Sequence, residues 1–222
     1  MFSLFIIGDA PGFALDGSKR AALKMLLAKI PGRGEALVMA ADQPGEQPFA
    51  HEGPGPALAF QIDFAGKAEA ESALAASGAL ADLPAALNLR PAALSHQLME
   101  AQPFPFNAPA MQDPFCTFLV TYPGTAADLP GWLKHYDAHH PPIMKRFPRI
   151  REVATYWPAE FASALPFQRG NAMQRNKVVF ETHADLVAAL ASPVMEEMRA
   201  DGRGFPASSA KATHFPYQTW RL

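Results

Sequence analysis

An indole ring, a phenol and an imidazole recur at helical spacing in the second half of the chain. Trp132, Tyr136 and His140 stand at i, i+4 and i+8, so a helix places them on one face. Histidine, with an ordinary pKa of about 6.5, can accept and return a proton near neutrality. The pattern predicts that His140 is a general acid/base and that Tyr136 is a neighbouring hydrogen-bond donor, with an aromatic substrate beside Trp132. The alternative is a Tyr/His face that hydrogen-bonds within the core.

Other protonatable and cationic side chains lie in the same half. Tyr156 is the third catalytic candidate, because its phenol can donate to a phenolate or carbonyl oxygen. The substrate-binding candidates, besides Trp132, are Tyr122, Arg151, His183, His214 and Tyr217. Arg151 would hold a substrate carboxylate through a bidentate fork. The alternative for Arg151 is a surface charge or a salt bridge with Glu152 or Asp137.

A metal site is not expected. His135 and His139 stand at i and i+4, but they face away from His140 at about 100° per residue. Zinc needs three or four ligands, and the chain has no His-Glu-x-x-His pattern. It also lacks a G-x-G-x-x-G motif, a Walker A loop and a G-x-S-x-G elbow. We therefore expect no metal, nucleotide or flavin cofactor.

The elements that position these residues occur twice. Residues 115–222 repeat the pattern of residues 1–100, for example in Pro148–Tyr156 against Pro31–Met39. We interpret this as a duplicated domain, since a solenoid would have a shorter period. Leu23 stands eight residues before Pro31, where His140 stands eight before Pro148. The second half therefore keeps the polar residues, and the first is predicted to be a scaffold.

Apolar periodicity predicts a βαββαβ order in each half. In the first half the expected strands are 2–7, 35–41, 58–64 and 92–99. One helix is expected at 18–29, with Ser18 as its cap. A second is expected at 67–76, followed by a further helical segment at 79–87. In the second half the expected strands are 115–122, 150–157, 176–182 and 212–220. The helices there are 129–146, with a break or end at Pro141-Pro142, and 184–200, with Pro193 opening its second part. Loops are expected at 44–56 and 158–175.

These elements predict an α+β fold, two ferredoxin-like repeats packed sheet to sheet as a barrel within one chain. The expected boundaries are 1–101 for the degenerate repeat, 102–114 for a stiff Pro-rich linker, and 115–222 for the active half.

Residues 132–157, WLKHYDAHHPPIMKRFPRIREVATYW, resemble the EthD-type domain of the dimeric α/β barrel superfamily. The shared pattern is an aromatic residue four before a histidine, then x-Pro-aliphatic and a later proline before a strand. Here these are Tyr136, His140, Pro142-Ile143 and Pro148. The resemblance implies cofactor-independent oxygenation, isomerisation, dehydration or decarboxylation of small, often aromatic, molecules. It also leaves haem open as an alternative cofactor, with His140 or His183 as the axial ligand.

Composition narrows the remaining classes. The chain has 222 residues, 49% of them hydrophobic and 18% charged, which is typical of a globular protein with a real core. A net charge of −2 gives no support for nucleic-acid or membrane-surface binding. One cysteine, Cys116, excludes an intrachain disulfide. The short apolar start lacks a basic region, so we expect a cytoplasmic protein, a monomer or homodimer.

We therefore expect a cofactor-independent lyase that decarboxylates a small oxygenated aromatic compound or cleaves a C–C or C–O bond in it. A cofactorless monooxygenase, or an isomerase or dehydratase of the same fold, is the first alternative. A small-molecule binding protein without catalytic activity is the second.

Overall fold

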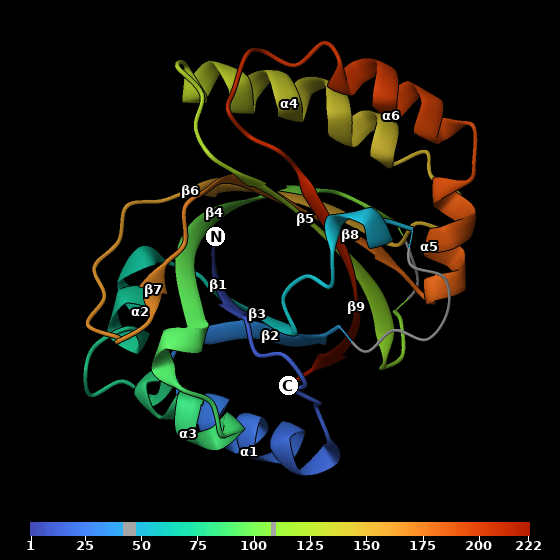
Figure 1. The fold of residues 1–222 in the computed structure, drawn as a ribbon. Helices are drawn as coiled ribbons and strands as arrows, with labels where there is room; N and C mark the ends of the chain where they lie inside the picture. The colour runs from blue at the N-terminus through green and yellow to red at the C-terminus, as the bar shows by residue number, and fades with distance from the viewer. Residues whose placement is uncertain (42–47, 108–109) are drawn as a thin grey trace.

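The computed structural model describes residues 1–41, 48–107 and 110–222. Parts of the expected loop 44–56 and of the expected linker 102–114 lie outside these ranges. Nine strands of the described chain form one sheet, and eight of them close into an antiparallel barrel (Figure 1). Helices cover the barrel from two opposite sides.

The barrel contains two sets of four strands with the same internal order. The first set is β1 (Phe2–Gly8), β2 (Arg33–Ala40), β3 (Leu58–Phe64) and β4 (Leu94–Phe104), in the spatial order β4-β1-β3-β2. The second set is β5 (Phe115–Pro123), β6 (Glu152–Pro158), β8 (Ala172–Phe180) and β9 (Thr213–Arg221), in the order β9-β5-β8-β6. Both are the ferredoxin-like order, so the predicted fold class is confirmed. That the halves arose by duplication stays a prediction.

Two seams join the halves. β2 pairs with β9, and β4 pairs with β6, both antiparallel. The short β7 (Gln168–Arg169) adds to β4 in parallel. Closure through both seams satisfies the strand edges that each half alone would leave exposed.

Each half carries its own layer of helices. α1 (Gly17–Leu27), α2 (Lys67–Ala73) and α3 (Leu83–Leu87) cover the first half. α4 (Leu129–Met144), α5 (His183–Leu190) and α6 (Val194–Gly202) cover the second half. Among the described residues, every helix is too short or too polar to cross a lipid bilayer.

Side chains on successive strand positions face opposite sides of the barrel wall. On β8, Arg175 and Lys177 face the barrel interior, whereas Asn176 and Val178 face the helices. Apolar side chains therefore form three clusters: one under each helix layer and one inside the barrel. Alternate residues of one strand can therefore line two separate sites, one on each face of the barrel wall.

Four local predictions were wrong. The expected loop 158–175 contains β7 and the first residues of β8, which begins at Ala172. Asp16, not Ser18, caps α1, because its carboxylate accepts from the Lys19 backbone N–H at 2.8 Å. α4 does not break at Pro141-Pro142 but runs on to Met144, and Lys145 N donates to Pro141 O at 3.0 Å. β4 extends to Phe104 instead of ending near Met99, because its last residues pair with β6 across the seam.

Candidate active site

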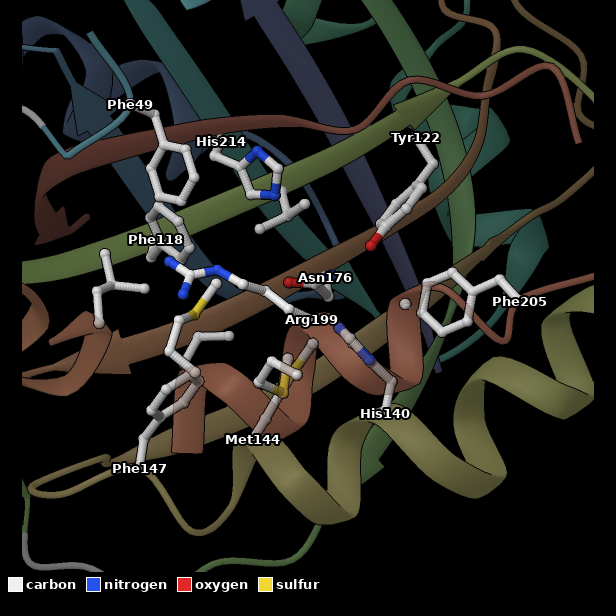
Figure 2. A pocket seen from close by; sticks show the side chains of 16 residues that line it. Phe49, Phe118, Tyr122, His140, Met144, Phe147, Asn176, Arg199, Phe205 and His214 are labelled. Atoms are coloured by element: carbon white, nitrogen blue, oxygen red, sulfur yellow. The ribbon is translucent and has the colours of Figure 1, made fainter. Parts of the chain in front are cut away.

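A cavity of about 170 Å³ lies between the helices of the second half and the outer face of the barrel wall. α4 and α6 form one side, β5, β8 and β9 form the other, and Phe49 of the first half lies at its margin (Figure 2). Most of its lining is apolar. The lining residues are Phe49, Phe118, Val120, Tyr122, His140, Met144, Phe147, Asn176, Val178, Leu190, Met195, Met198, Arg199, Gly202, Phe205 and His214.

His140 enters the cavity from α4. Asp128 caps this helix by accepting from Gly131 N at 2.9 Å. Asp137 fixes its rotation against β6, because its carboxylate accepts from the Thr155 hydroxyl at 2.8 Å and from the Trp157 indole at 2.9 Å. His140 is thereby held on the buried face of the helix.

A carboxylate of α6 orients this imidazole. Nδ1 of His140 lies 2.6 Å from Oδ2 of Asp201, and the side chain of His140 is 8% exposed. The ring contacts Phe205 edge-on at a centroid distance of 4.9 Å. With Nδ1 on the carboxylate, Nε2 is the nitrogen left for the cavity.

A second histidine–carboxylate pair faces the same cavity from the opposite wall. Nδ1 of His214 on β9 lies 2.8 Å from Oε1 of Glu52, and Oε2 of Glu52 accepts from the His214 backbone N–H at 2.6 Å. Phe49 stacks on the His214 ring at a centroid distance of 4.4 Å. In Figure 2 the rings of His140 and His214 are turned toward the space between them.

Both imidazoles are predominantly neutral near pH 7. Burial lowers the pKa of His140 below its ordinary value, and the Asp201 carboxylate opposes that effect only in part. Burial likewise lowers the pKa of His214, against the opposing effect of Glu52. Because each carboxylate retains a proton on Nδ1, each Nε2 offers a lone pair to the cavity. Two such bases facing one apolar space are suited to proton transfer.

Tyr122 provides a hydrogen-bond donor between them. Asn176 Nδ2 donates to the Tyr136 hydroxyl at 2.6 Å, and the Tyr136 hydroxyl is hydrogen-bonded to that of Tyr122. Burial raises the pKa of Tyr122 to about 12, so its phenol keeps its proton. Figure 2 shows the Tyr122 oxygen pointing into the cavity.

The residues predicted from the sequence fall into two groups. His140, Tyr122 and His214 line the cavity. Tyr136 and Trp132 lie directly behind it, stacked on each other at a centroid distance of 5.2 Å. The helical stripe therefore exists, with the imidazole as its only member in the cavity.

The other candidates lie elsewhere, so the expectation of one shared pocket has to be corrected. Tyr156 and Tyr217 point into the barrel interior, on the opposite side of the wall from His140. Arg151 pairs with Glu181 at 2.6 Å and does not line the cavity. His183 is the first residue of α5, not the end of a strand, and it also lies outside the cavity lining.

The sequence reasoning missed four polar residues of the site. Asp201 and Glu52 hold the two histidines, Asn176 completes the tyrosine hydrogen bonds, and Arg199 lies exposed in the cavity lining. Asn176 offered a signal, since it is a polar residue on the same face of the expected strand as Val178 and Phe180. The carboxylates had none, because each acts across a long sequence separation.

In the first half, the place that corresponds to the candidate active site is filled by the protein's own side chains. Leu23 is fully buried among aliphatic side chains. His96, the counterpart of His214 on β4, has both ring nitrogens engaged: Nδ1 lies 3.0 Å from Gln168 O and Nε2 lies 2.8 Å from the Ser163 hydroxyl. No nitrogen of His96 is therefore left for a substrate.

The described side chains form no metal site, and they do not place His183 as a haem ligand in this cavity. Within the described ranges no three His, Cys, Asp or Glu residues gather as a metal-binding group. His183, one of the two expected axial ligands of a haem, does not line the cavity.

Comparison with known proteins gives information on the fold of the chain only. No family model and no curated protein matches the chain. An anthrone oxidase-like protein matches with a TM-score of 0.61 and 12% identity over 99% of this chain and 92% of the other. A candidate monooxygenase from Lactobacillus acidophilus matches with a TM-score of 0.56 and 14% identity over 99% and 92%. A mutant chlorite dismutase from Candidatus Nitrospira defluvii matches with a TM-score of 0.54 and 9% identity over 99% and 91%. These likenesses concern the fold alone: the chain shares the dimeric α/β barrel fold with these proteins.

Proposed function

We propose that the chain is an enzyme that removes a proton from a small oxygenated aromatic compound without a cofactor. The observation that carries the proposal is the pair of carboxylate-held histidines, His140 and His214, on opposite sides of one apolar cavity. A protein that only binds an apolar ligand has no need for two oriented bases. The EthD-like character of residues 132–157 supports the same chemistry and stays a prediction.

In the proposed reaction, the aromatic ring of the substrate first binds among the Phe and Met side chains of the cavity. Nε2 of one histidine takes a proton from an acidic C–H or O–H group of the substrate, and its carboxylate stabilises the imidazolium that forms. Tyr122 donates to the oxygen that gains negative charge. The apolar lining excludes water and so strengthens both interactions.

The second histidine allows the reaction to finish as a lyase or an isomerase. It can return a proton at another atom or protonate a leaving group. The exposed guanidinium of Arg199 is suited to a substrate carboxylate at the rim. Decarboxylation or C–C or C–O cleavage is therefore our first candidate reaction.

Oxygenation is the second candidate. The fold is shared with an anthrone oxidase-like protein and a candidate monooxygenase, which favours this alternative. The carbanion formed by proton removal would react with O₂, so that a CH₂ group and O₂ become C=O and water. The same histidine would remove the first proton in both reactions.

Deuterium exchange tests the step that these reactions share. The protein is incubated in D₂O with anthrone, a hydroxybenzoate and a β-keto acid, and NMR follows exchange of the acidic C–H. We expect enzyme-dependent exchange or turnover with at least one compound, and its loss in the double variant His140→Ala/His214→Ala. Turnover that persists without O₂ supports the lyase, whereas turnover that needs O₂ supports the oxygenase. Saturable binding without exchange or turnover across the panel would indicate a binding protein.

A further inference from the structure

A second cavity lies inside the barrel, on the other face of the wall that carries His214. It is half-open, has a volume of about 150 Å³, and lies at the barrel end where β5 ends and β8 and β9 begin. Thr213 and Phe215 line it, whereas His214 between them lines the candidate active site. A space that holds one water needs roughly 10–15 Å³, so this cavity has room for a small organic molecule.

Among the residues that the structure describes, Arg175 is the only charged one in the lining of this cavity. Arg175 is buried, with only 6% of its surface exposed. Nη1 donates to the Thr121 hydroxyl at 2.7 Å, whereas Nε is buried and has no hydrogen-bond partner among the described residues. Within the described part of the chain, the guanidinium therefore has a polar neighbour but no carboxylate partner.

The other buried cation of the barrel shows the contrast. Lys177, two positions along the same strand, forms an ion pair with Glu152 at 2.8 Å. Asp63, the remaining carboxylate near it, accepts from Ser3 at 2.6 Å and from Gln61 at 3.0 Å. A buried charge without a counter-charge is costly, which makes the unpaired guanidinium of Arg175 a feature that requires an explanation.

Packing against neighbouring side chains explains only part of the burial of the Arg175 guanidinium. It lies 5.4 Å from the centre of the Phe5 ring, a contact that uses its face. Nη1 is taken by Thr121 and Nε is enclosed, whereas Nη2 has no hydrogen-bond partner among the described residues, so Nη2 is the group left for a ligand. Burial lowers the pKa of Arg175 to about 10, so it still carries its charge at neutral pH.

We infer that this cavity binds a small carboxylate, with Arg175 as the anion partner. Arginine matches the planar geometry of a carboxylate. Ser95, Asn171 and Thr213 supply polar groups around the anion, and Leu119 and Phe215 contact a short hydrocarbon part. This site is separate from the proposed active site and does not depend on the proposed function.

Benzoate and propionate are suitable probes, with benzamide and propionamide as neutral controls. ¹H–¹⁵N NMR titrations of the full chain at constant ionic strength should show saturable shifts at Leu119, Arg175 and Phe215, which line this cavity, with the carboxylates only. Arg175→Met, which keeps an unbranched apolar stem but removes the charge, should bind at least tenfold more weakly. Thr213→Leu keeps Arg175 but fills the cavity, and should also lose binding. Arg199→Met removes the exposed guanidinium of the other cavity and should leave these shifts unchanged.

The outcomes separate a binding site from a structural arginine. Equal carboxylate shifts in wild type and Arg175→Met would overturn the inference, as would equal binding of the amides. So would the absence of any shift in the wild type. If Arg175→Met fails to fold, Thr213→Leu decides the matter: carboxylate binding retained in that variant would also overturn it. Neither result depends on turnover, so the failure of the proposed function would leave this test intact.

Discussion

Nδ1 of His214 lies 2.8 Å from Oε1 of Glu52, a carboxylate 162 positions earlier in the chain. Glu52 follows β2 in the first half, whereas His214 lies on β9 in the second. The β2–β9 seam brings these segments together. The first half therefore contributes a residue that orients a histidine of the candidate active site, so it is more than a scaffold.

Glu52→Gln should alter both the rate and its pH dependence. Glu52 opposes the lowering of the pKa of His214 by burial, so loss of its charge should lower that pKa further. If His214 acts as a base, the acid limb of kcat/KM against pH should move to lower pH. kcat should fall by less than the roughly 10²–10⁴-fold expected for loss of a base. Glu52→Asp, which keeps the charge, should restore part of both; identical pH profiles would exclude this role.

His140→Ala should lower kcat by about 10²–10⁴-fold, the usual contribution of a positioned acid or base. The matched control is His139→Ala, since His139 is the exposed neighbour on the same helix. Steady-state kinetics on a confirmed substrate measure both. A wild-type rate in His140→Ala would assign the chemistry to another group.

The sequence predicts the fold well because the fold depends on local patterns that occur twice. Apolar alternation and helical spacing give the strand and helix order of both halves. The helical stripe Trp132, Tyr136 and His140 follows from the same periodicity, and the rings do lie in contact along α4. These features need no knowledge of distant neighbours.

The composition of the site depends on contacts that no local pattern encodes. Asp201 reaches His140 only because α6 packs on α4, and Glu52 reaches His214 only across the seam. Tyr156 and Tyr217 were grouped with His140 by their residue type. Strand alternation places both in the barrel interior, which the sequence could have shown only once the helix-covered face was known.

The free energy of unfolding should fall as the pH is lowered from about 7 to 5. Burial lowers the pKa values of His96, His140 and His214 in the folded state, whereas in the unfolded chain they are about 6.5. Below about pH 6.5 the unfolded state therefore binds more protons, and stability is lost as the pH falls toward the folded-state values. Urea unfolding at several pH values should give a shallower slope for His140→Leu than for the wild type. Parallel curves would contradict the assigned direction.

Leu23→Ala should destabilise the protein without changing its chemistry. Leu23 is a fully buried residue of α1, and such a truncation costs about 2–5 kcal/mol. Met25 on the same helix is 67% exposed, so Met25→Ala should be nearly neutral. kcat measured below the unfolding transition should be unchanged in both variants. A large fall in kcat for Leu23→Ala in a folded sample would place catalytic function in the first half.

Tyr122→Phe should lower kcat more than Tyr136→Phe. Tyr122 lines the cavity and is placed to donate to a developing oxyanion, and loss of such a donor costs about 10²–10³-fold in kcat. Tyr136 lies behind it and acts only by holding the Tyr122 hydroxyl through a hydrogen bond. Removal of the Tyr136 hydroxyl therefore leaves the donor present but less well oriented. Steady-state kinetics at saturating substrate give the comparison, and thermal unfolding of both variants checks that the buried aromatic cluster is intact. An equal or larger loss in a folded Tyr136→Phe protein would show that Tyr136, not Tyr122, interacts with the reacting atoms.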